Sequence, residues 1–504
     1  MRKDTTNVGA QPCAPTDTSH LPELPRGWVW TRLEEVCLEP QYGWTTSAAA
    51  KGKLHLLRTT DITSGNIDWD SVPFCKEEPP QKEKYLLSDG DIVISRAGSV
   101  GYSHLLKNPK QAIFASYLIR FRPLVDERYL AFFLKSPSYW QFISEKSLGI
   151  AIPNVNASKL KQIAVPLPPL AEQRRIVAKI EELFTELDAG VEALRKVKAQ
   201  LKRYRQAVLR HAFEGKLTEA WREAHKGELE PASVLLEKIG SERQCRGAQP
   251  CAPTVDTSSL PQLPEGWVWT RLSMCSNLIT KGESPKWQGF EYVENGIPFI
   301  RSENVLWGHV DVSNVARIPE EFHKKLKRSR IVASDVLINL VGASIGRCGI
   351  VPSSIANANI NQAVAIIRAN DTLETPYLMH LLLSPQMQKT IHAGKVETAR
   401  PNISLTDLNN LLIPLCSLAE QHKVVEEIER RLSISDEVEK VVEQSLKQAE
   451  RLRQSILKRA FEGKLVLQDP NDEPADKLLE RIKQARIQNV GAHSRAPKTT
   501  RMKR

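Results

Sequence analysis

The sequence lacks the features that would indicate a membrane-inserted, disulfide-bonded or zinc-binding protein. No apolar run reaches the roughly 18 residues that a membrane span needs, and residues 1–20 have no apolar core of the kind found in signal peptides. The eight cysteines include no C-x-x-C pair, and no two histidines lie at zinc-ligand spacing. We therefore expect a cytoplasmic protein with reduced thiols, no bound metal and no membrane partner.

Motifs of enzymes that act on nucleotides or nucleic acids are also missing. There is no G-x-x-x-x-G-K-[ST] loop, and a turn after a strand explains the glycines of residues 335–349 better than a cofactor loop does. There is no Asn/Asp-Pro-Pro-aromatic motif of an amino-methyltransferase. The acidic-x-Lys pattern of metal-dependent nucleases occurs at Glu214-Gly215-Lys216 and Glu462-Gly463-Lys464. Helices that end at glycine explain both segments better. We expect no active site and no cofactor in this chain.

The composition is that of a globular protein with an excess of positive charge. Hydrophobic residues make up 41% of the chain and charged residues 26%, which excludes wholesale disorder. The 70 lysines and arginines outnumber the 59 acidic residues, which gives a net charge of +11 at pH 7. This excess permits a polyanionic partner without identifying one.

The chain is a tandem duplication with a repeat of about 240 residues. LPRGWVWTRL (24–33) recurs as LPEGWVWTRL (263–272), PLPPLAEQRRIV (166–177) as PLCSLAEQHKVV (414–425), and RHAFEGKL (210–217) as KRAFEGKL (458–465). Residues 34–165 and 273–413 match at only a few scattered positions. The two repeats are therefore expected to have one scaffold and two different surfaces. Three similar Pro- and Ala-rich segments, at 7–16, 246–254 and 489–499, have a composition typical of linkers.

Two segments are predicted to form long helices that pair with each other. Residues 171–211 contain no proline, and their apolar residues recur at heptad spacing. One register holds Ile180, Leu187, Leu194, Leu201 and Val208, and the other holds Leu183, Val197 and Tyr204. The second repeat offers Val425, Ile428, Val438, Val442, Ala449, Leu452 and Ile456. About 40 residues at ~1.5 Å each predict a rod of about 60 Å.

The predicted fold class is α+β. Two mixed α/β domains are separated by two long antiparallel helices that form a coiled coil, in an internal tandem repeat with pseudo-twofold symmetry. The expected segments are a flexible N-terminal segment (1–20), a first domain (21–165), a first long helix (166–217), a short helix and linker (218–259), a second domain (260–413), a second long helix (414–465), and a short helix with a basic tail (466–504).

This order of variable and constant parts closely resembles the specificity (S) subunit of type I restriction-modification systems. The resemblance is carried by LAEQRRIV and LAEQHKVV, each followed by AFEGKL, and by the LPxGW motifs at 24–28 and 263–267. Lys281-Gly282-Glu283-Ser284-Pro285, leading to Gly296-Ile297-Pro298-Phe299-Ile300, also fits. The first repeat departs from this pattern, because Gly43-Trp44-Thr45-Thr46 has no proline. The resemblance spans about residues 21–484.

The resemblance implies a non-catalytic subunit that reads a bipartite, asymmetric site on double-stranded DNA. Each variable domain would be a target recognition domain for one half-site, and the paired helices would set the gap and dock two modification subunits. Those methyltransferase subunits would bind S-adenosylmethionine and methylate adenine. Added restriction (motor-nuclease) subunits would use ATP and Mg to translocate and cut DNA.

Candidate DNA-contacting residues follow from the side chains that read bases: Arg for guanine, Asn or Gln for adenine, and Ser or Thr as adaptable partners. In the first domain they are Arg58, Thr59, Thr60, Arg96, Ser99, Asn154 and Asn156. In the second they are Lys281, Arg301, Asn304, Ser344, Arg347, Asn361, Gln362, Arg400 and Asn402. The helix cations Lys196, Lys198, Lys202, Arg203 and Arg205 either contact phosphates or solvate the helix.

Two other interpretations of the sequence stay open. A coiled-coil scaffold could bind two protein partners through its divergent domains, and a lack of DNA affinity at low salt would favour it. A free-standing DNA enzyme is the third, and the missing motifs count against it.

If the paired helices set the gap between two DNA half-sites, the gap should depend on the length of the helices. Inserting one heptad into each long helix should lengthen it by about 10 Å and widen the gap between half-sites by about 3 base pairs. Sequencing of methylated DNA measures that gap. An unchanged gap would show that the helices do not set it.

Overall fold

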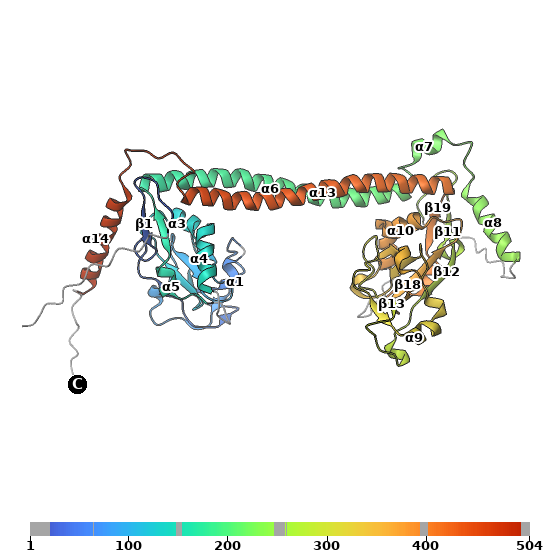
Figure 1. The fold of residues 1–504 in the computed structure, drawn as a ribbon, viewed down its shortest axis with the longest axis horizontal. Coiled ribbons are helices and arrows are strands. Elements are labelled where there is room, and N and C mark those ends of the chain that lie inside the picture. The colour runs from blue at the N-terminus through green and yellow to red at the C-terminus, as the bar shows by residue number, and fades with distance from the viewer. Residues whose placement is uncertain are drawn as a thin grey trace, which may run out of the picture. The chain divides into compact units, whose positions relative to one another are not determined.

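The computed structural model describes residues 21–63, 65–147, 154–245, 258, 260–393 and 402–494. The chain divides into two compact units, the first made of residues 1–194 and 444–504 and the second of residues 195–443. Each unit therefore contains one globular domain and a stretch of both long helices (Figure 1). The predicted mixture of helices and strands around two long helices is confirmed.

The first domain is built from short strands with small helices between them. Its elements are β1 (Val29–Arg32), β2 (Gln41–Tyr42), β3 (Ala48–Ala49), β4 (His55–Leu57), α1 (Thr59–Ile62), β5 (Phe74–Cys75), α2 (Lys82–Tyr85), β6 (Ile92–Ser95), β7 (Ser103–Leu105), β8 (Ala112–Phe114), β9 (Leu118–Phe121), α3 (Glu127–Phe133), α4 (Pro137–Ser147), α5 (Ala157–Lys161) and β10 (Ala164–Leu167). One sheet has the order β2-β9-β6-β7 and another the order β3-β5-β4-β8, while β1 pairs with β10.

The second domain repeats this plan. Its elements are β11 (Val268–Arg271), β12 (Ser276–Lys281), β13 (Ile297–Ile300), β14 (Ala316–Ile318), α9 (Glu320–Lys325), β15 (Val336–Asn339), β16 (Cys348–Ile350), β17 (Asn359–Ile360), β18 (Val364–Ala369), α10 (Thr375–Leu383), α11 (Pro385–Ala393), α12 (Leu405–Asn409) and β19 (Leu412–Leu415), with five 3-10 turns. The sheets β12-β18-β15-β16 and β14-β13-β17 and the pair β11-β19 correspond to those of the first domain.

The long helices are α6 (Leu170–Phe213) and α13 (Leu418–Phe461), each 44 residues long. Each ends at a glycine with positive φ, Gly215 at 68° and Gly463 at 67°. Lys216 N–H donates to the carbonyl of His211, and Lys464 N–H to that of Arg459, which closes the last turn in both helices. The expected helix stops are thus confirmed. Three shorter helices follow in the chain, α7 (Glu219–Ala224), α8 (Ala232–Cys245) and α14 (Ala475–Ser494).

Within each unit the two helices run antiparallel. In the first unit, Arg453 pairs with Asp188 and lies over the ring of Phe184. In the second, Lys198 contacts Glu443 at 2.7 Å, and Arg205 contacts Glu439 at 2.7 Å and Asp436 at 2.6 Å. Of the helix cations that are candidates for phosphate contact, Lys198 and Arg205 bind the facing helix.

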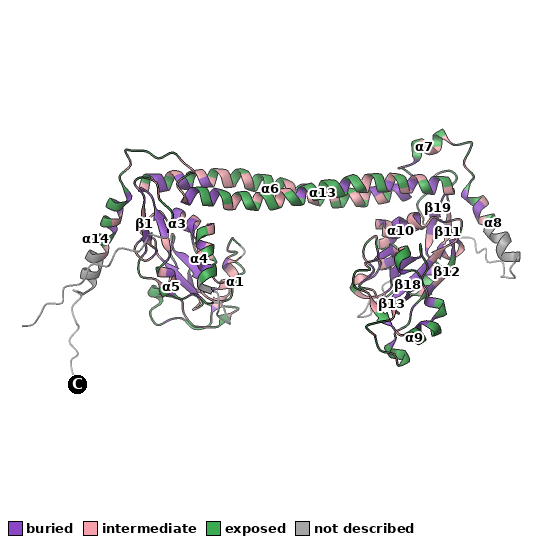
Figure 2. Ribbon diagram, in the orientation of Figure 1, coloured by how far each residue is buried: buried purple, intermediate pink, exposed green. Residues whose placement is uncertain are grey.

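Part of the predicted heptad pattern is wrong. Tyr204, Val438 and Leu452 were assigned to the helix interface, but they are 43%, 39% and 49% exposed. Lys198 and Arg205 instead reach carboxylates of the facing helix with their charged ends. Figure 2 shows exposed and partly buried residues alternating along both helices.

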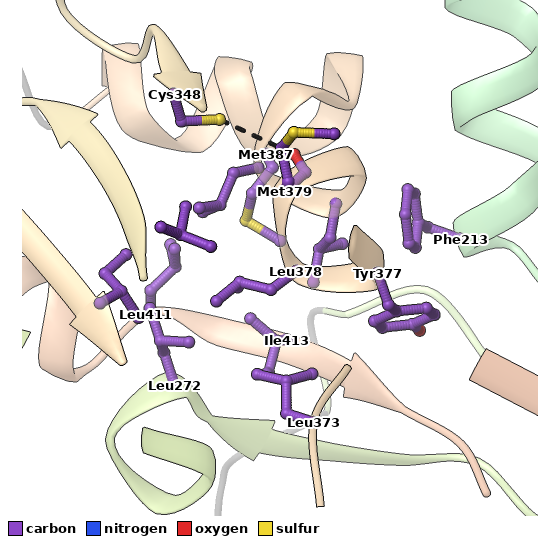
Figure 3. Packing of buried hydrophobic residues seen from close by; sticks show 14 of the residues in the cluster. Phe213, Leu272, Cys348, Leu373, Tyr377, Leu378, Met379, Met387, Leu411 and Ile413 are labelled. Carbon is purple, nitrogen blue, oxygen red and sulfur yellow. Dashed lines mark hydrogen bonds between the residues drawn. The ribbon is translucent and has the colours of Figure 1, made fainter. Parts of the chain in front are cut away.

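Each domain core extends onto a helix of its own unit. Phe461 of α13 packs edge-to-face against Tyr129 and Phe133 in the first unit. Phe213 of α6 does the same against Tyr377 in the second unit, where Leu272, Leu378 and Ile413 belong to the same cluster (Figure 3). Each buried phenylalanine contributes about 1.5–3 kcal/mol to the free energy of unfolding.

The repeated LPxGW and AEQ motifs meet in a buried hydrogen bond. Trp28 Nε1–H donates to Glu172 Oε2 at 3.0 Å, and Trp267 Nε1–H donates to Glu420 Oε2 at 2.8 Å. Burial raises the pKa of Glu172 above its usual value. The indole is therefore a needed partner for a carboxylate that water does not reach.

Only some of the predicted linker segments and some of the cysteines belong to the described part of the chain. The segments at 7–16 and 246–254 lie outside the described residues, whereas residues 489–494 belong to α14. Cys37, Cys75, Cys275, Cys348 and Cys416 are buried and form no disulfide. No helix among the described residues has the length and apolar character that crossing a bilayer requires.

Trp28→Phe should lower the free energy of unfolding of the first unit by about 1–3 kcal/mol, because it leaves a buried carboxylate without its donor. Thermal unfolding of the full chain measures the effect. Trp30→Phe is the control, since its indole donates to the carbonyl of Pro22 at an exposed position, and it should change stability by about 0.5 kcal/mol or less. Equal losses in both variants would contradict this role of Trp28.

Candidate nucleic-acid interface

Strand ends of both sheets meet along one edge of the first domain. The connection between β8 and β9 joins them: Trp44 N–H donates to Phe114, Ser116 N–H to Trp44, and Ala115 N–H to Leu57. Arg96, directly after β6, donates its N–H to the carbonyl of Tyr117. Asn154 forms a bridge with Ala97. We call these segments (42–44, 57–58, 96–102, 114–118 and 154–156) the first edge.

The second domain repeats this hydrogen-bond pattern. Asn361 N–H donates to Ile300, Leu340 N–H donates to Ala363, and Asn402 forms a bridge with Val341. Segments 281–283, 300–301, 340–347, 361–363 and 402–404 therefore form the second edge. The backbone is shared by the two edges, and most of the side chains on it differ.

Glycine is needed where the edge is most crowded. A Cβ on Gly43 would lie 2.2 Å from the carbonyl oxygen of Ala115, and one on Gly282 would lie 1.8 Å from that of Ile360. Both are far below van der Waals contact with backbone atoms, so neither position accepts a side chain. The first repeat thus keeps this glycine, although it lacks the proline that follows it at residue 285.

Of the predicted residues in the first domain, Arg58, Arg96, Ser99, Asn154 and Asn156 lie on the first edge. The guanidinium of Arg58 is held by Asp61 through Nε at 3.0 Å and Nη2 at 2.7 Å. Asn156 caps α5 by accepting from Lys159 N–H at 2.9 Å. Thr59 and Thr60 follow Arg58 in the single turn of α1, where Thr60 is exposed.

In the second domain the edge brings together most of the predicted residues. They are Lys281, Arg301, Ser344, Arg347, Asn361, Gln362 and Asn402. Arg301 pairs with Glu303 and lies over the ring of Tyr292. The Asn361 side chain accepts from Ala363 N–H at 3.1 Å, which shapes the connection to β18. Arg400 lies outside the described residues.

Asn304 does not suit base reading. It is only 3% exposed, and its side chain accepts from Arg301 N–H and donates to the carbonyls of Asp311 and Asn314. Its counterpart in the first repeat, Asp61, likewise accepts from Arg58 N–H at 2.8 Å. Both residues hold the loop that follows a strand, and the burial of Asn304 is not evident from the sequence.

Sequence reasoning missed several residues on the first edge. Tyr42, Trp44, Ser116 and Tyr117 lie on it, and Tyr117 is 57% exposed. Asn361 and Gln362 were selected in the second repeat, and the aligned positions in the first are Ala115 and Ser116. An alignment of the two repeats would therefore have indicated that Ala115 and Ser116 lie on the first edge.

Titratable groups elsewhere give no sign of a reactive cluster within the described residues. Among the described residues no group of three or more His, Cys, Asp or Glu side chains is placed to hold a metal ion. Burial, together with Lys135, lowers the pKa of His104 to about 4, so its imidazole is neutral at pH 7.

Comparisons with known proteins match both repeats. The family model for the type I restriction modification DNA specificity domain matches residues 25–201 and 264–448. The EcoBI specificity subunit of Escherichia coli is 29% identical over 88% of this chain and 88% of its own length. The EcoKI specificity subunit of Escherichia coli K12 is 28% identical over 93% of this chain and 97% of its own.

A solved structure supports the fold. A chain from a type I restriction-modification system, studied for its complex assembly and conformational transition, matches with a TM-score of 0.60 at 22% identity. The match covers 88% of this chain and 99% of that one. With the family model matching both repeats, the chain belongs to the type I restriction modification DNA specificity domain family.

Proposed function

We propose that this chain is the DNA-recognition subunit of a type I restriction-modification complex and reads a bipartite, asymmetric site. The observation that carries the proposal is the pair of edges with one backbone pattern and two sets of side chains. A shared backbone hydrogen-bond pattern suits one mode of docking on DNA, and different side chains suit two different half-sites. The net charge of +11 suits a polyanionic partner.

Catalysis belongs to partner subunits in this proposal. Modification subunits bind S-adenosylmethionine and methylate adenine, and restriction subunits use ATP and Mg to cut DNA in the cytoplasm. This chain contributes the recognition of sequence and the separation of half-sites, with no active site, cofactor or metal of its own.

Sequencing of adenine methylation tests the proposal. In cells that express this chain with its modification subunit, methylated DNA should show two short defined blocks separated by a fixed gap. Replacing residues 21–165 with the same domain of another family member should change one block and leave the other intact. A complex that assembles but has no affinity for any DNA at low salt would instead support the protein-scaffold interpretation.

A second observation concerns the modification subunits. Ile434, Val438 and Val441 of α13 lie at i, i+4 and i+7 on one helix face, and they are 56%, 39% and 60% exposed. We call this the apolar stripe. Such a stripe on a polar helix suits the apolar face of a partner helix, so we propose that a modification subunit packs on it.

Val441→Asp should weaken assembly with the modification subunit about tenfold or more, because it buries a charge in an apolar contact. Mass photometry of the reconstituted complex measures the subunit ratio. Leu467→Asp is the matched control, since Leu467 is 92% exposed and lies outside the stripe. Equal assembly of both variants would show that the stripe is not the docking surface.

A further inference from the structure

Arginines of the first domain differ in whether their guanidinium groups are already occupied. Arg58 is bound by Asp61, and Arg122 contacts Asp91 at 2.9 Å. Arg120 donates to the carbonyls of Leu86 and Lys84. Arg96 has no acceptor among the described residues, and its Nε is buried without a hydrogen-bond partner.

The surroundings of Arg96 fix its position without occupying its donors. Its backbone N–H donates to Tyr117, and its carbonyl accepts from Val155 N–H at 3.0 Å. The guanidinium lies over the ring of Tyr42, 5.2 Å from the centroid. Tyr42 is itself held, because its hydroxyl accepts from Ala157 N–H at 2.9 Å. The side chain therefore rests on an anchored aromatic ring at the edge, with donors free.

The second domain contains a comparable arginine at a different place. Arg347 also has a buried Nε without a partner among the described residues. Its carbonyl accepts from Asn339 N–H at 2.9 Å, and its own N–H donates to Ser344. The turns 96–102 and 340–347 connect equivalent strands, β6 to β7 and β15 to β16. Arg96 is the first residue of the turn in the first domain. In the second domain Leu340 occupies that position, and Arg347 is the last residue of the turn.

Because Nε is closed to solvent in both arginines, a ligand would be bound by the terminal Nη groups of the guanidinium. Guanine offers two acceptors, O6 and N7, in the major groove, and a guanidinium matches both at once. An arginine held on an aromatic ring loses little side-chain freedom on binding. A phosphate can engage the same guanidinium, so the experiment has to separate a base contact from a phosphate contact.

From these observations we infer that Arg96 and Arg347 each read a guanine, one in each half-site of the DNA. This inference rests on the proposed function and adds the residues that determine specificity. Because the two arginines lie on opposite limbs of equivalent turns, the guanines occupy different positions within the two half-sites. The asymmetry of the whole site follows in part from this displacement.

The test is selection of binding sequences from a library of randomised DNA duplexes by the complex of the full chain with its modification subunits. The wild-type complex should select a motif with a guanine in each block. Arg96→Ala should reduce the preference for guanine at one position of one block about ten- to hundredfold, and leave the other block unchanged. Arg347→Ala should do the same in the other block, so each variant is a control for the other.

Two further variants separate base reading from charge and from folding. Arg96→Lys keeps the charge over the Tyr42 ring but has no bidentate fork, so it should lose most of the same preference. It decides the matter if Arg96→Ala fails to fold. Arg122→Ala removes a cation that is already paired with Asp91 and should leave the motif unchanged.

Three results would overturn the inference. A wild-type motif with no G·C pair in one block excludes a guanine contact there. A uniform loss of affinity for all sequences in Arg96→Ala, with a shallower dependence on salt, identifies a phosphate contact instead. If the wild-type complex selects no bipartite motif at all, the proposed function fails together with this inference.

Discussion

A buried hydrogen bond between an indole and a carboxylate joins each domain to a long helix, and the remaining contacts depend on it. Glu172 and Glu420 lie in the first turn of α6 and α13, where the helix dipole favours a negative charge. Trp28 and Trp267, which immediately precede β1 and β11, donate to these carboxylates. In the second unit Thr218 and Arg222 also bind Glu420, at 2.7 and 2.6 Å. The domain is thereby fixed against the start of the helix.

The neighbouring glutamine extends the same junction into the domain. Gln173 donates to the carbonyl of Pro168 and accepts from Asp126 N–H, just before α3. Gln421 makes the equivalent bonds to Cys416 and Glu374. Tyr129 and Tyr377 donate to the carbonyls of Pro166 and Pro414, on the strands that precede the helices. The most similar segments of the two repeats are those that build this junction.

With the junction fixed, the edges are free to differ. Their backbones are held by the same hydrogen bonds in both domains, so exposed side chains on an edge can differ while the backbone pattern is kept. Arg58 and Arg301 are kept in both repeats and are paired with Asp61 and Glu303. Arg96 is replaced by Leu340, and Tyr102 by Arg347. One scaffold thus presents two sets of donors and acceptors, which the reading of an asymmetric site requires.

The sequence alone determined the duplication, the two long helices with their glycine ends, and the strands around them, because these depend on local patterns and on similarity between repeats. It did not determine which residues pair between the helices: Arg205 binds Glu439 and Asp436 while Tyr204 is exposed, since this pairing depends on the facing helix. The tertiary structure also decided which candidates share an edge. Asn304 is buried by the loop it supports, and Arg96 differs from Arg58 because its guanidinium has no acceptor among the described residues. Burial and unpaired donors arise from contacts between residues distant in the chain, so the sequence could propose these residues but could not sort them.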